Sequence, residues 1–144
     1  MLIGEYTHNL DKKRRISIPA RMRKELGEKV VLTRGLDQCL FLYPVTEWQG
    51  IADRLNQLPM GKTATRQFVR LMLAGAMEIE IDALGRVLIP EHLKRYAGLH
   101  EKVVITGVSS RAEIWDAGRW NSYREHVEEN ADELAEKLGE LGMY

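Results

Sequence analysis

An internal repeat constrains this chain more than any other feature of its sequence. The segment from Asp11 to Pro19 aligns with the segment from Asp82 to Pro90, and both follow the pattern Asp-x-x-x-Arg-(Ile/Val)-x-Ile-Pro. With a two-residue insertion in the second copy and a one-residue gap opposite Arg34, the alignment continues to Gly35 and Gly107, and 11 of the 24 aligned pairs are identical. Such a match between two short windows indicates a duplicated unit of roughly 50 residues.

Both copies predict the same order of secondary structure. A proline is tolerated in the first turn of a helix and a glycine commonly follows its last turn, so Pro19 with Gly27, and Pro90 with Gly98, delimit one short helix in each copy. Apolar runs and alternating patterns predict strands around these helices. The expected strands are 6–10, 16–18, 30–33 and 39–43 in the first copy and 77–81, 87–89, 103–106 and 112–115 in the second, and the expected helices are 20–26 and 91–97.

Three further helices are expected outside the repeated unit. Thr46 is a candidate cap for a helix at 47–57, and a second helix is expected at 63–74. A third helical stretch is expected from 116 to 141, because apolar residues recur there at a spacing of three to four. Three methionines are expected to fill gaps in the core, namely Met60, Met72 and Met77.

One copy of the repeat is too short to bury a good core alone, so we expect the two copies to complete each other. The predicted fold is α+β: two fused repeats that form a small β-barrel or sheet with pseudo-twofold symmetry, with connecting and C-terminal helices. The predicted organisation is a first repeat at 1–50, a helical linker at 51–75, a second repeat at 76–120 and a C-terminal acidic helix at 121–144.

The formal net charge is zero, from 21 bases and 21 acids, which alone would argue against a nucleic-acid partner. The charges are unevenly placed, however. The formal net charge is +5 over residues 1–35, +1 over residues 36–112 and −6 over residues 113–144. The neutral total therefore conceals a basic N-terminal segment and an acidic C-terminal one.

Patterns typical of enzymes and cofactor sites are absent from the sequence. The four histidines lack zinc-ligand spacing, and neither a phosphate-binding glycine loop nor a nucleophile elbow occurs. We therefore expect a protein that is not an enzyme, with no metal, no cofactor and no small-molecule substrate. The single cysteine, Cys39, fits a reducing compartment, either as a small buried residue or as a reactive thiol. Without an apolar run long enough to span a bilayer or a signal peptide, the expected location is the cytoplasm, with no membrane contact.

The run from Lys12 to Arg15 is the strongest candidate for binding. It lies in a predicted turn directly after Asp11, and arginine can donate two parallel hydrogen bonds to phosphate or guanine. One alternative is a basic turn that only keeps the surface soluble. Another is structural, because Asp11 with Arg15, and Asp82 with Arg86, could form an ion pair that braces each turn.

These motifs resemble the MraZ family, in which two swapped-hairpin repeats of the AbrB type stand in tandem. The resemblance rests on the two Asp-x-x-x-Arg motifs at this separation and on their flanks, and it covers the chain to about residue 125. The further matching pieces are Leu-Phe-Leu-Tyr-Pro at 40–44 followed by Glu47-Trp48, Arg-Val-Leu-Ile-Pro at 86–90, and Glu-Ile-Trp-Asp at 113–116.

The resemblance implies a sequence-specific DNA-binding transcriptional regulator, acting as a repressor, of the bacterial division and cell-wall gene cluster. It implies binding to short direct repeats in double-stranded DNA near its own promoter, by a ring of identical subunits associated with the nucleoid. By position, the expected DNA contacts are Lys12, Lys13, Arg14, Arg15 and Arg86, and the motif acids are Asp11 and Asp82.

The sequence departs from the family at Arg14, where a glycine is usual and where the second copy has Gly85. A residue other than glycine disfavours a left-handed turn, so the resemblance alone does not determine the geometry of the first turn. A second class of function also stays open, an antitoxin-like or other protein-binding module that uses the acidic segment 113–144. A third is a purely structural assembly protein, in which Arg15 would have no role in DNA binding.

Overall fold

The computed structural model describes residues 1–143, and its two halves repeat the same order of elements. The first half contains β1 (Leu2–Asn9), β2 (Arg15–Ser17), α1 (Ala20–Leu26), β3 (Lys29–Arg34), β4 (Leu40–Pro44), α2 (Val45–Asn56) and α3 (Thr63–Ala74). The second half contains β5 (Met77–Glu80), β6 (Arg86–Leu88), α4 (Glu91–Ala97), β7 (Lys102–Ser109), β8 (Ala112–Asp116), α5 (Ala117–Glu129) and α6 (Ala131–Glu140). Both short helices lie between proline and glycine as predicted.

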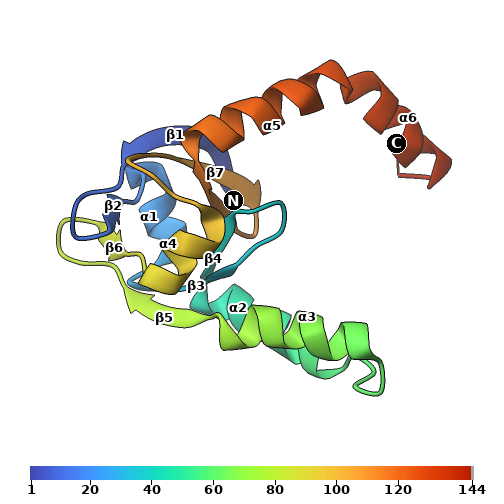
Figure 1. The fold of residues 1–144 in the computed structure, drawn as a ribbon, viewed down its shortest axis with the longest axis horizontal. Coiled ribbons are helices and arrows are strands. Elements are labelled where there is room, and N and C mark those ends of the chain that lie inside the picture. Colours follow the sequence, from blue (N-terminus) through green and yellow to red (C-terminus); the bar gives the residue numbers. More distant parts are fainter. Residues whose placement is uncertain (144) are drawn as a thin grey trace.

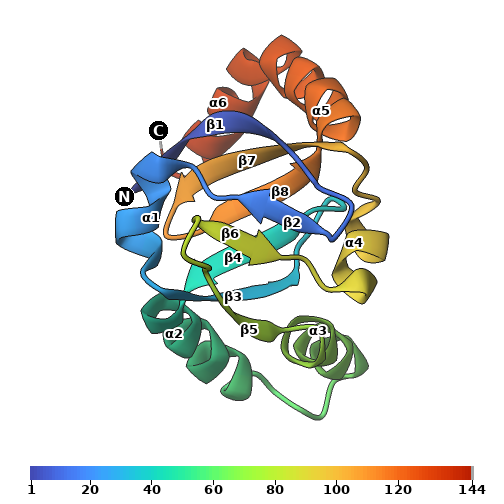
Figure 2. The same cartoon turned by 90° about the vertical axis from the view of Figure 1, so that its left-hand side faces the viewer.

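The two repeats exchange strands. Six strands form one antiparallel sheet in the order β1-β7-β8-β4-β3-β5, and β2 pairs with β6 in a separate antiparallel ribbon. Strand β1 of the first repeat pairs with β7 of the second, while β5 of the second pairs with β3 of the first (Figure 2). The predicted α+β fold of two fused repeats is therefore confirmed. Of the two shapes left open, the six strands form a sheet and not a closed barrel.

The main core lies between the ribbon and one face of the sheet, and both repeats contribute to it. Ile16 and Val87 are paired across the ribbon and point inward, with at most 1% of either residue exposed. Ile18, Ile89 and Leu93 are fully buried beside them. Each such side chain contributes about 1.5–3 kcal/mol on burial. Because this core needs both halves, neither repeat is expected to fold without the other.

The opposite face of the sheet carries a second core beneath the helices. Alternation along β4 sends Leu40 and Leu42 to the main core, and Phe41 and Tyr43 to the second one. Cys39 is fully buried there, and its Sγ donates a hydrogen bond to the carbonyl oxygen of Leu36 at 3.1 Å. Burial raises the pKa of the Cys39 thiol, so this residue is a small buried side chain and not a reactive nucleophile.

Two details of the expected helices are wrong. Helix α2 begins at Val45, directly after Pro44, so Thr46 lies within its first turn and does not cap it. The C-terminal stretch is two helices instead of one, because α5 ends at Glu129 and α6 begins at Ala131. In Figure 1, α5 leaves the body beside β7, and α6 lies at the far end of this arm, away from the sheet.

The expectation for the methionines is confirmed at only one of three positions. Met72 is buried against the second core, whereas Met60 and Met77 are about half exposed. Met60 lies in the loop between α2 and α3, and Met77 lies on β5 at the edge of the sheet. Loops and edge strands have few neighbours, so a side chain there stays exposed even when it is apolar.

Candidate nucleic-acid interface

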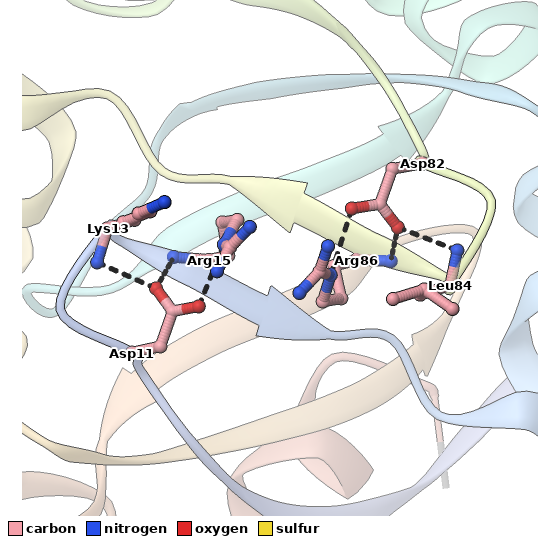
Figure 3. Close-up of polar contacts among 6 residues, drawn as sticks. All are labelled: Asp11, Lys13, Arg15, Asp82, Leu84 and Arg86. Carbon is pink, nitrogen blue, oxygen red and sulfur yellow. Dashed lines mark hydrogen bonds and ion pairs between the residues drawn. The ribbon is translucent and has the colours of Figure 1, made fainter.

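The β2–β6 ribbon forms one outer face of the molecule, and a tight turn precedes each of its strands. The first turn, residues 11–15, leads into β2, and the second turn, residues 82–86, leads into β6. Because the strands are antiparallel, the two turns lie at opposite ends of the ribbon (Figure 3). In Figure 1 the ribbon lies on the left, whereas the ends of the helical extensions point to the right.

Asp11 organises the first turn. Its Oδ1 accepts hydrogen bonds from the backbone N–H groups of Lys13 and Arg15, each at 2.8 Å, and its Oδ2 accepts one from Arg15 Nε at 2.8 Å. Within the backbone, Arg14 N donates to the Asp11 carbonyl oxygen and Asp11 N to that of Arg15, both at 3.0 Å. One carboxylate thus closes the turn and orients the arginine.

Asp82 organises the second turn in the same way. Its Oδ1 accepts from the backbone N–H groups of Leu84 and Arg86, and its Oδ2 accepts from Arg86 Nε, all at 2.9 Å (Figure 3). The pKa of Asp11 and that of Asp82 both lie below their ordinary value, chiefly because the backbone N–H of the motif arginine stabilises the ionised carboxylate. Both acids therefore stay charged across the neutral range.

The two motif arginines project from the same outward face of the ribbon. Arg15 is paired with Leu88, and Ser17 with Arg86, whereas the residues between them point into the core. Each arginine is held through Nε alone, and within residues 1–143 its two terminal nitrogens have no hydrogen-bond partner in the protein. Since guanidinium donates up to five hydrogen bonds, each side chain keeps a planar pair of outward donors whose orientation is already restricted.

Arg14 adopts a left-handed backbone conformation, which residues other than glycine rarely adopt. Its φ is 61°, close to the 77° of Gly85 at the equivalent position, so both turns have the same backbone form. The Arg14 side chain lies against the second repeat, where Nε donates to the carbonyl oxygen of Ile89 at 3.0 Å and a terminal nitrogen lies 3.6 Å from Glu91. These contacts hold the residue in a conformation that otherwise costs free energy.

Arg23, one of the bases that follow the first turn in the sequence, makes the corresponding contact at the other end of the ribbon, which the sequence pattern did not indicate. Its Nε donates to the carbonyl oxygen of Ile18 at 2.9 Å, as Arg14 does to Ile89. Its guanidinium occupies the space above Gly85, where an added Cβ would lie only 2.2 Å from Arg23 Cζ. At the first turn the guanidinium comes from the turn itself, and at the second turn it comes from α1 of the first repeat.

The tips of the two turns differ in the charge and polarity of their exposed side chains. Lys12 and Lys13 are exposed at the tip of the first turn, and the exposed Arg21 and Lys24 lie on α1. The tip of the second turn carries Ala83 and Leu84, and Leu84 is 67% exposed. Leu88 is also half exposed, beside Arg15, and sequence reasoning missed it because its pattern resembles that of a buried strand. The tip of the first turn is thus strongly basic, whereas the tip of the second is apolar and has the bases of α1 beside it, with Arg23 over Gly85.

The chain is similar to proteins of a known family over almost its full length. The profile of the MraZ protein, described as antitoxin-like, matches residues 1–71 and again residues 72–140. The chain belongs to the MraZ family. Proteins named transcriptional regulator MraZ from Lactobacillus gasseri, Syntrophomonas wolfei and Acetivibrio thermocellus are 50%, 46% and 47% identical to it. Each alignment spans 99% of this chain and 100% of the relative.

The MraZ profile divides the chain in the middle of α3, and each match contains one Asp-x-x-x-Arg turn. Within residues 1–143 no helix is long and apolar enough to cross a membrane. In the same range, no three side chains of the kinds that ligate metals gather closely enough to hold an ion.

Proposed function

We propose that this member of the MraZ family is a sequence-specific DNA-binding transcriptional regulator, and that the first turn is its main contact with DNA. The observation that carries the proposal is the arginine of that turn. Arg15 is held by Asp11 through Nε, with its terminal nitrogens directed outward beside two exposed lysines. A planar pair of donors matches the O6 and N7 acceptors of guanine in the major groove.

The basic residues of the first turn have different roles in this proposal, according to whether their side chains are already bound within the protein. Lys12 and Lys13 are exposed and make no ion pair within the described residues, so they are suited to neutralise phosphates and to position the ribbon. Arg15 contacts a base edge. Arg14 is already engaged with Ile89 and Glu91, so it contributes positive potential and only a secondary phosphate contact. Arg86 has the same geometry as Arg15, but the tip of its turn carries Ala83 and Leu84 in place of two lysines, so it makes a weaker contact.

One first turn offers few contacts, and its affinity for DNA is correspondingly low. Several identical subunits in a ring would meet several short direct repeats at once, and the effective concentration of each further turn would multiply these weak steps. Binding near the chain's own promoter, in the division and cell-wall gene cluster, would block transcription by covering the promoter. Such a protein would be found on the nucleoid.

The experiment that tests the proposal is a binding titration with the duplex that lies upstream of the chain's own coding sequence. Arg15→Ala should weaken binding by about 1–3 kcal/mol for each base edge that Arg15 reads, and Arg15→Lys should recover the charge without the planar fork. Arg86→Ala is the matched control, because it removes the same side chain from the same geometry in the turn whose tip carries no base. Fluorescence anisotropy at two or more salt concentrations measures both affinity and salt dependence.

The outcomes separate the alternatives. A larger loss for Arg15→Ala than for Arg86→Ala supports the first turn as the contact with bases. Equal losses would mean that the two turns act alike and would contradict the division of roles. If the unaltered chain fails to bind this duplex at low salt, the proposed function is wrong.

A further inference from the structure

The outward face of the ribbon carries a large apolar side chain that the fold leaves uncovered. Leu88 ends β6 and is 47% exposed, although Val87 and Ile89 on either side of it are buried. Alternation along the strand turns Val87 into the core and Arg86 and Leu88 outward. In the first repeat, Ser17 occupies the equivalent place in β2. Because a polar side chain holds that place, the fold itself does not require a leucine on this face.

The register of the ribbon places Leu88 directly beside Arg15. The two residues are partners across β2 and β6. In the adjoining pair, Ile89 N donates to the carbonyl oxygen of Arg14 at 2.7 Å. Hydrogen-bonded and non-hydrogen-bonded pairs alternate along an antiparallel ribbon, so Arg15 and Leu88 form a pair of the second kind, whose Cα atoms lie only about 4.5 Å apart. The outward donors of Arg15 and the apolar side chain of Leu88 therefore project side by side.

The chemistry of the major groove matches this combination of side chains. The groove admits a two-stranded ribbon, and guanine presents there the O6 and N7 acceptors that suit Arg15. Leucine has neither a donor nor an acceptor, so phosphates and polar base edges offer it nothing. The C5-methyl group of thymine is the apolar group that the bases present in this groove. It projects from the base edge, so a side chain shorter than arginine can reach it from the same ribbon.

We propose that Leu88 covers the C5-methyl group of a thymine in the base pair next to the guanine that Arg15 contacts. The inference rests on the proposed function and adds a second base to the sequence that the first turn recognises. The partner of the guanine is cytosine, which carries no methyl group, so the thymine belongs to a neighbouring pair. Neighbouring base pairs lie about 3.4 Å apart along the duplex, a spacing similar to that of the two side chains. Beside Arg86, Ser17 offers no such apolar contact.

Replacing thymine by deoxyuridine in the upstream duplex tests the proposal, because it removes methyl groups and leaves every donor and acceptor in place. In anisotropy titrations the unaltered chain should bind the uracil duplex about fourfold more weakly for each methyl group that Leu88 covers. Leu88→Asn should lose this difference between the two duplexes, whereas Leu88→Met, which keeps an apolar side chain of similar volume, should retain it. A variant that folds poorly would lose affinity for both duplexes alike, so the ratio of the two affinities reports on the contact itself.

Leu84→Asn is the matched control, because Leu84 is an exposed leucine at the tip of the second turn and not beside Arg15 (Figure 3). It should keep the full ratio of the two affinities. Single replacements by deoxyuridine then locate the thymine, and 7-deazaguanine, which lacks the N7 acceptor, locates the guanine that couples to Arg15→Ala; the two should lie in neighbouring base pairs.

Four results would overturn the inference and leave DNA binding itself intact. They are equal affinity of the unaltered chain for both duplexes, an undiminished ratio in Leu88→Asn, a lost ratio in Leu84→Asn, or a sensitive thymine that is not next to the guanine. An unaltered chain that fails to bind even the thymine duplex at low salt would overturn the proposed function together with the inference.

Discussion

The two turns of the ribbon share a scaffold and differ in what they present. Asp11 and Asp82 each accept the same three hydrogen bonds, and each motif arginine is held through Nε. Between acid and arginine, the first turn carries three bases and the second carries Ala-Leu-Gly. The acid and the arginine therefore shape the turn, whereas the three residues between them determine its electrostatic character.

The left-handed position shows how the two copies reach the same turn with different residues. Gly85 adopts its positive φ without steric cost, and Arg23 fills the space that a side chain would occupy. Arg14 adopts a positive φ with its side chain in place and uses that side chain to hydrogen-bond the neighbouring repeat. At each end of the ribbon one guanidinium of the first repeat thus donates to the carbonyl oxygen of an isoleucine, Arg14 to Ile89 and Arg23 to Ile18.

The largest expected effect comes from making the first turn a copy of the second. The triple variant Lys12→Ala/Lys13→Leu/Arg14→Gly keeps Asp11 and Arg15, so the turn should close as before. Its DNA affinity should fall sharply, and the slope of log affinity against log salt should become shallower by about 0.9 for each phosphate that the turn no longer neutralises. Anisotropy titrations of the upstream duplex over a range of salt concentrations measure both quantities.

The reciprocal change serves as the control for that exchange. Ala83→Lys/Leu84→Lys adds two charges to the second turn without altering Asp82, Gly85 or Arg86. It should strengthen non-specific binding and steepen the salt slope, since both positions are exposed. An unchanged slope in the triple variant would show that the first turn is not where the chain neutralises phosphates.

The sequence predicted the order of elements well, because prolines and glycines mark the ends of each short helix and the repeat supplies every signal twice. It did not predict which strands pair, since the exchange of β1 and β5 between repeats depends on contacts far apart in the chain. The break at Asn130 was also missed, because the apolar spacing continues across it. Asn130 Nδ2 donates to the carbonyl oxygen of His126 at 2.8 Å, a local bond that competes with helical continuation.

The sequence predicted the ion pair of each turn but not the other contacts that shape the candidate site. The spacing of Asp11 and Arg15 suggested an ion pair, and the structure places these groups 2.8 Å apart. Nothing in the pattern indicated that Arg14 would turn back onto Ile89, or that Arg23 would lie over Gly85. Both contacts join segments that are far apart in the chain, which local propensity cannot describe.

A smaller effect, on the free energy of unfolding, is expected at the position of each turn that has a positive φ, occupied by Arg14 in the first turn and by Gly85 in the second. Gly85→Ala should lower the free energy of unfolding by about 1–3 kcal/mol, because it strains the backbone and displaces Arg23 from its hydrogen bond with Ile18. Arg14→Gly should change it by less than about 1 kcal/mol, since relief of backbone strain offsets the removal of one hydrogen bond. Urea unfolding of the two variants checks the difference, and a more stable Gly85→Ala protein would contradict it.

The smallest expected effect is a response to acid that both turns share. The folded pKa of Asp82 lies below its ordinary value of 3.8, so its contribution to stability is complete above that value and is lost as the pH falls through the folded pKa. The folded pKa of Asp11 is lowered in the same direction, so the stability that Asp11 contributes is lost over the same acidic range. Unfolding of the unaltered chain and of Asp82→Asn should therefore differ by a constant amount between about pH 7 and about pH 5, and the difference should shrink below about pH 4. Asp11→Asn should follow the same curve even though only its turn is basic, because the acid response belongs to the shared hydrogen bonds. Different curves for the two variants would mean that the neighbouring bases, and not the backbone N–H groups, hold the carboxylate.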